Sequence, residues 1–109
     1  MTGPTSESPV RDLLADMTAE SVAASSLDKT SLMLVRIAAL VAVDAPAVSY
    51  LLNLDAASEI GIDAEQVRGV LAAVAPIVGT ARVASATGKI LEALAVEIEI
   101  VESAEVNAQ

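Results

Sequence analysis

The chain has 109 residues, enough for one domain, and a domain of this size buries about two-thirds of the surface that its unfolded chain exposes. Hydrophobic residues make up 54% of the composition, with one Tyr and no Phe or Trp, so the helices must pack through small aliphatic side chains and leave apolar surface for a homo-oligomer. The net charge of −9 disfavours nucleic acid as a partner, and the absence of Cys excludes disulfides, thiolate catalysis and Cys-ligated metals.

Local signals predict an all-α chain of about six helices in a single domain, residues 9–102. The predicted helices span, in order, residues 9–16, 19–25, 30–43, 46–60, 64–75 and 79–102. Residues 1–8 are rich in Ser, Thr, Gly and Pro and are predicted to form a disordered tail. The polar residues 103–109 are predicted to form a frayed tail.

The first three helices are predicted from caps and from apolar spacing. Ser8 precedes Pro9, the residue that most often opens a helix at its first position. Thr18 can cap a second, short helix. The helix over residues 30–43 is apolar on every side, a pattern that indicates a buried helix.

The remaining boundaries carry stronger signals. The residue before Pro46 disfavours helical backbone, so the third helix must end there. Gly61 is suited to the left-handed conformation that ends a helix. Asp63 and Gln66 form the pattern of a capping box for the next helix, which Pro76 is expected to close.

Charged residues interrupt every apolar run in the chain. No stretch reaches the roughly 18 uncharged apolar residues that a transmembrane helix needs, so no membrane partner is expected. The first nine residues lack the basic region and following apolar block of a signal peptide. These patterns predict a cytoplasmic protein.

The segment LVRIAALVAVDAPAVSYLLNLDAASEIG, residues 34–61, carries the most specific pattern in the chain. With the spacing from Asn53 to Gly61 and on to Gly79, and an Asp-x-Glu-x-Val motif at 63–67, it resembles the core of the carboxymuconolactone decarboxylase and alkylhydroperoxidase D family. The resemblance implies an all-α bundle of about six helices, assembled as trimers or as hexamers built from dimers. It also implies one of two activities, lactone decarboxylation or thiol-dependent hydroperoxide reduction.

The positions where this family places its chemistry hold other residues here. By the resemblance, the thiol branch carries Cys at 46 and 49, His at 53 and Glu at 34, whereas this chain has Pro46, Ser49, Asn53 and Leu34. A Ser hydroxyl is not oxidised through a sulfenic acid, so thiol peroxidase activity is not expected. The decarboxylase-like members keep the His, and the amide of Asn53 cannot donate and accept a proton in turn.

Five residues are candidates for ligand binding. Arg36 lies in the middle of the most apolar helix, and a buried guanidinium needs an anion, either a ligand carboxylate or an acidic residue of the protein or a neighbouring subunit. Ser49, Tyr50 and Asn53 share one helix face, where they can line a ligand pocket or satisfy each other across a subunit interface. Arg82 follows a Gly-Thr helix start that suits an anion or a plain cap.

These patterns support two interpretations of function. The first is a carboxymuconolactone decarboxylase-like protein that binds or transforms a small organic molecule between subunits, a carboxylated one where Arg36 serves the ligand. The alternative is an oligomeric scaffold that has lost its catalytic groups. No phosphate-binding loop, Ser/His/Asp arrangement or metal-ligand spacing appears, so no metal and no cofactor is expected.

Overall fold

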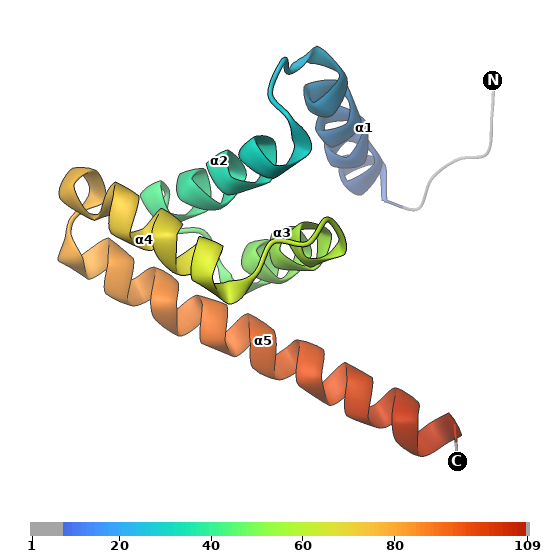
Figure 1. The fold of residues 1–109 in the computed structure, drawn as a ribbon. Coiled ribbons are helices and arrows are strands. Elements are labelled where there is room, and N and C mark those ends of the chain that lie inside the picture. The colour runs from blue at the N-terminus through green and yellow to red at the C-terminus, as the bar shows by residue number, and fades with distance from the viewer. Residues whose placement is uncertain (1–7, 109) are drawn as a thin grey trace, which may run out of the picture.

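The computed structural model describes residues 8–108, with side chains described for residues 8–95. All regular structure in this part of the chain is α-helical, which confirms the all-α class. Its five helices are α1 (Pro9–Ala24), α2 (Lys29–Ala42), α3 (Ala47–Glu59), α4 (Ala64–Val78) and α5 (Thr80–Ala108) (Figure 1). The tail predicted for residues 1–8 lies outside the described residues except for Ser8, which precedes α1.

A single helix, α1, replaces the first two helices that the sequence predicts, so the expected number of about six is wrong. Thr18, expected to cap the second helix, donates its hydroxyl to the carbonyl of Leu14 at 2.9 Å and stays within the helix. No Gly or Pro occurs between Val10 and Ala24 to interrupt the backbone hydrogen bonds. With neither a breaker nor a cap, the helix continues.

The turn between α2 and α3 lies before Pro46, as predicted. Here Asp44 adopts a left-handed backbone with φ of 54°, a conformation that Asp enters more readily than most residues with a side chain. Its carboxylate Oδ1 accepts hydrogen bonds from Ser85 Oγ at 2.7 Å and from Lys89 Nζ at 2.9 Å. These bonds attach the turn to α5.

The two ends of α4 differ in how well the sequence predicts them. Asp63 Oδ1 accepts from the backbone N–H of Gln66 at 2.9 Å, and Gln66 Oε1 accepts from the N–H of Asp63 at 3.0 Å, which confirms the capping box. The helix continues past Pro76, so the predicted end at this residue is wrong. Pro76 removes one backbone hydrogen bond in the last turn, and the chain leaves the helix at Gly79, whose φ is 90°.

The core lies between α2, α3, α4 and α5, which pack against one another, while α1 has no buried residue. It consists of Leu32, Met33, Ile37, Val41, Ala45, Tyr50, Leu54, Ala57, Ile62, Val70, Ala86, Ile90 and Ala93. The expectation that the helix over residues 30–43 is buried on every side is wrong, since Val35 within α2 and Val43 at its end are more than half exposed. Its solvent face carries Ala and Val, which a sequence pattern cannot distinguish from core residues.

The last helix, α5, projects beyond the bundle and continues to Ala108 (Figure 1). Its backbone is therefore helical across residues 103–108, which the sequence assigns to a frayed tail, and fraying in solution stays a prediction. Within the described residues, no helix is both long enough and apolar enough to cross a membrane.

Candidate functional site

A hollow of about 540 Å³ lies between α1, α2 and α3, and we call it the Arg36 hollow. Its lining residues are Leu14, Met17, Thr18 and Ser21 of α1, Met33, Arg36, Ala39 and Leu40 of α2, and Leu52, Asn53 and Ala56 of α3. Two of the five residues predicted to bind a ligand, Arg36 and Asn53, are therefore brought together by the packing of α2 against α3.

Arg36 is partly buried and does not lie in the dry core that the apolar pattern of its helix predicts. Its Nη2 donates to Ser21 Oγ at 3.0 Å and to the carbonyl of Thr18 at 3.4 Å, and both acceptors belong to α1. No carboxylate of the described residues lies within ion-pair distance of the guanidinium. The described part of the chain therefore satisfies Arg36 with neutral acceptors and leaves its charge without a counter-ion.

Asn53 is oriented by a hydrogen bond within its own helix. Its Nδ2 donates to the backbone carbonyl of Ser49, one turn earlier, at 2.8 Å. The amide oxygen of Asn53 has no partner among the described residues, so it can accept a hydrogen bond from a ligand. Ser49, Tyr50 and Asn53 do not form the single polar patch that the sequence predicts. The side chain of Tyr50 is buried in the core.

The other three predicted binding residues, Ser49, Tyr50 and Arg82, do not line the Arg36 hollow. Tyr50 is completely buried, and its hydroxyl has no hydrogen-bond partner among the described residues. Burial, and then the negative charge of Asp44, raise the pKa of this hydroxyl, so it stays protonated. Arg82 is exposed on α5. The pKa of Asp44 is lowered chiefly by its hydrogen bond from Lys89, and the positive charge of Arg82 lowers it further.

The groups of the Arg36 hollow suit binding better than proton transfer. They comprise a guanidinium, an amide and the hydroxyls of Thr18 and Ser21, and they include no carboxyl, imidazole or thiol that could act as a general acid or base. Of the other positions compared with the carboxymuconolactone decarboxylase pattern, Pro46 is exposed before α3 and Leu34 packs against the core. The described residues contain no group of three or more side chains that could hold a metal ion.

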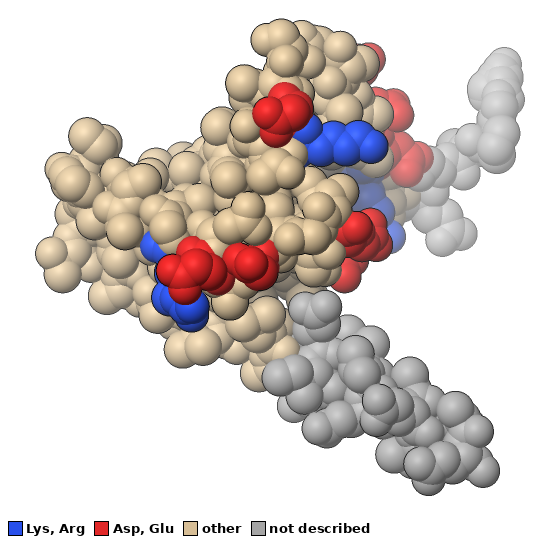
Figure 2. Space-filling model, in the orientation of Figure 1, with Lys and Arg blue, Asp and Glu red and all other residues tan. Residues whose placement is uncertain are grey.

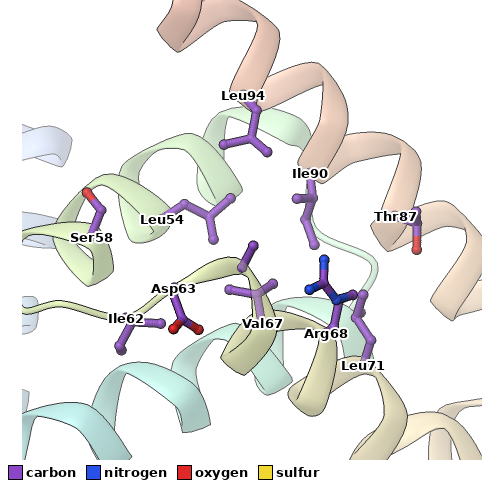
Figure 3. A pocket seen from close by; sticks show the side chains of 11 residues that line it. Leu54, Ser58, Ile62, Asp63, Val67, Arg68, Leu71, Thr87, Ile90 and Leu94 are labelled. Carbon is purple, nitrogen blue, oxygen red and sulfur yellow. The ribbon is translucent and has the colours of Figure 1, made fainter.

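A second hollow, of about 350 Å³, lies between α3, α4 and α5 (Figure 3), and we call it the α3–α4–α5 hollow. Its apolar lining is formed mainly by Leu54, Ile62, Val67, Leu71, Ile90 and Leu94, with Ser58, Asp63, Arg68 and Thr87 as its polar side chains. No sequence pattern predicts a ligand role for these residues, because Leu, Ile and Val at helical spacing indicate a core. The cation Arg68 among them was the one available signal.

No family model, curated protein or solved structure matches this chain. The resemblance of residues 34–61 to the carboxymuconolactone decarboxylase family therefore stays a prediction.

Proposed function

We propose that this chain is a carboxymuconolactone decarboxylase-like protein that binds a small carboxylated organic molecule in the Arg36 hollow, without a cofactor and without thiol peroxidase chemistry. One observation supports this proposal above the others. Arg36 lines a hollow of about 540 Å³ together with Asn53, and no described carboxylate pairs with it. A partly buried guanidinium is stabilised by an anion, and a ligand carboxylate supplies one.

The acceptors that now hold Arg36 compete weakly with a carboxylate. The bond to the Thr18 carbonyl is long, at 3.4 Å, and the Ser21 hydroxyl is a neutral acceptor. A carboxylate offers two charged oxygens that match the two-pronged geometry of a guanidinium. Apolar side chains such as Met33 and Leu40 suit the hydrocarbon body of the ligand, and Asn53 can bind its second polar group.

Assembly belongs to the same proposal. Leu14, Met17 and Leu52 line the Arg36 hollow, and each is more than half exposed, so the hollow is open to solvent in one chain. We propose that a neighbouring subunit closes it, in a trimer or in a hexamer built from dimers. Closure excludes water, and a charged contact is stronger where water is excluded.

Binding is better supported than turnover. Protonating a carbanion after decarboxylation needs an acid that can give up a proton near neutral pH. None of the side chains that line the Arg36 hollow is such an acid, and an Asn stands where the related decarboxylases keep a His. A lyase-type transformation would depend on groups of the ligand or on water.

One observation favours the alternative function, an oligomeric scaffold. The helix α1 contributes nothing to the core and leaves large apolar side chains exposed, namely Val10, Leu13, Leu14, Met17 and Val22. Exposed apolar side chains that gather on one element are typical of a surface that another protein covers. In this interpretation the function of the protein is to form the assembly itself, and Arg36 orients α1 within it.

Titration calorimetry with benzoate and its neutral analogue benzyl alcohol tests the ligand proposal. Arg36→Met keeps much of the stem and removes the charge, so benzoate should bind about 2 kcal/mol more weakly, or about 30-fold, while benzyl alcohol should be unaffected. Arg82→Met is the matched control, because Arg82 is exposed and does not line the hollow. The unliganded Arg36→Met protein should lose about 1 kcal/mol of stability or less.

Two outcomes would contradict the proposal. Equal affinity of benzoate for the wild type and for Arg36→Met would show that Arg36 does not bind the carboxylate. A loss of about 3 to 5 kcal/mol, or of the oligomer, on Arg36→Met without binding of any carboxylate would instead show a structural ion pair between subunits and favour the scaffold.

A further inference from the structure

The α3–α4–α5 hollow is walled by apolar side chains from three helices. In Figure 3, Leu54 of α3, Val67 and Leu71 of α4, and Ile90 and Leu94 of α5 point toward one space. None of the polar residues that line it is buried. An apolar cavity with a few polar groups at its edge is the usual form of a site for a small organic molecule.

Arg68 gives this hollow a hydrogen-bonding group with spare capacity. Its Nη2 donates to Glu65 Oε2 at 2.6 Å, and its side chain is 67% exposed. The hydrogen bond from Arg68 to Glu65 also raises the pKa of the guanidinium, which is charged at any physiological pH. A guanidinium has five N–H donors, and the others have no partner among the described residues.

We propose that the α3–α4–α5 hollow binds a monocarboxylate with an apolar chain, such as a medium-chain fatty acid. The chain would lie among the leucine and isoleucine side chains and the carboxylate would meet the unused N–H groups of Arg68. A volume of about 350 Å³ is roughly twice that of an engineered cavity that holds benzene, which suits a body of about ten carbons. The nearby carboxylates of Asp63 and Glu65 disfavour a ligand with more than one negative charge.

An apolar helix of a second copy is a poorer occupant than a carboxylate. It would cover the unused N–H groups of Arg68 without offering them an acceptor. The site is also independent of the Arg36 hollow. With 3.6 residues per turn, Leu54 and Ser58 lie on the opposite face of α3 from Leu52 and Ala56.

Binding of decanoate and of decanol, measured by calorimetry at submillimolar concentration, tests this assignment. Thr87→Trp places a large ring over the hollow from an exposed position and should weaken both probes about tenfold or more. Arg68→Gln should weaken decanoate about tenfold and leave decanol unchanged. Ala84→Trp is the matched control, because Ala84 is exposed on the same helix and does not line the hollow.

Arg36→Met separates this site from the proposed function. Decanoate affinity should survive that substitution, so loss of decanoate binding in Arg36→Met alone would place the fatty acid in the other hollow and overturn the assignment. Failure of wild-type protein to bind decanoate, or equal binding to Thr87→Trp and Ala84→Trp, would overturn it as well. Where Thr87→Trp does not fold, as judged by circular dichroism, Ser58→Phe closes the same hollow from the exposed side of α3.

Discussion

Tyr50 brings the single aromatic ring of the chain into an aliphatic core, together with a hydroxyl that has no hydrogen-bond partner among the described residues. Burying a hydroxyl without a partner costs about 1 to 3 kcal/mol. The ring fills a volume that would otherwise be a cavity, and filling it stabilises the fold. The two parts of one side chain therefore act on stability in opposite directions.

Replacing Tyr50 separates these two effects. Tyr50→Phe should raise the free energy of unfolding by about 1 kcal/mol, because it removes the unpaired hydroxyl and keeps the ring. Tyr50→Ala should lower it by about 3 to 5 kcal/mol, because it leaves a cavity. Urea unfolding followed by circular dichroism measures both changes. A Tyr50→Phe protein less stable than the wild type would mean that the hydroxyl has a partner in solution, such as a buried water.

Arg36 shows which part of a site a sequence can predict. Its place in an apolar helix predicts that it needs a polar partner, and the structure supplies two in α1. Those partners, Thr18 and Ser21, lie 18 and 15 residues earlier, and no local pattern places α1 beside α2. The meeting of Arg36 with Asn53 likewise depends on the packing of two helices, which spacing along the chain does not reveal.

Helix boundaries could be predicted where all the groups that form the cap lie within a few residues of one another in the sequence. The reciprocal bonds of Asp63 and Gln66, and the φ of 88° at Gly61, match the sequence patterns. Thr18 and Pro76 mislead because each can serve either inside a helix or at its end, and the surrounding backbone bonds decide which. Apart from the cation Arg68, the α3–α4–α5 hollow has no local signal, since its walls have the same residue types as the core.

The turn between α2 and α3 is attached to α5 by one carboxylate. Asp44 accepts from Lys89 and from Ser85, and Lys89 Nζ also donates to the backbone carbonyl of Asp44 at 3.3 Å. The hydrogen bond from Lys89, followed by that from Ser85, lowers the pKa of the Asp44 carboxyl. Because both ion-pair partners are partly exposed, water and salt weaken this attachment.

Acid should therefore weaken the fold through this turn. A carboxyl with a lower pKa in the folded state binds protons more readily when unfolded, so its contribution is fully present above about pH 4 and is lost as the pH falls through the folded-state pKa. Urea midpoints measured from about pH 5 to about pH 2.5 should fall, and Asp44→Asn should reduce the slope. The pKa of Asp28 is lowered by a hydrogen bond from the backbone N–H of Ser31, so Asp28 should account for part of the pH dependence that remains in Asp44→Asn. An unchanged slope in Asp44→Asn would contradict this role.

The whole molecule is more extended than a compact chain of its length. Its radius of gyration is 16.0 Å, against about 13 Å for a compact domain of this size, and α1 and the end of α5 project from the bundle (Figure 1). Figure 2 shows charged residues gathered in a few groups, with much of the described surface on this face uncharged. Such a shape and surface suit a chain that is completed by copies of itself.

The apolar stripe of α1 gives this expectation a specific location. Val10, Leu13, Leu14 and Met17 follow a spacing of three and four residues and lie on one side of the helix, each more than half exposed. Ala19 lies on the opposite side, by the same geometry. Burying one Leu side chain contributes about 1.5 to 3 kcal/mol, so a covered stripe of four residues is enough to matter for assembly.

Light scattering at micromolar concentration should accordingly give a mass of three or six chains, where one chain has 11.0 kDa. Leu13→Asp should shift the population toward single chains, because it would bury a charge in the proposed interface without touching the Arg36 hollow. Ala19→Asp adds the same charge to the other face of α1 and should leave the mass unchanged. Both positions are exposed in the single chain, so neither substitution should unfold it. A wild-type mass near that of one chain, or equal effects of the two substitutions, would show that the stripe is not an interface.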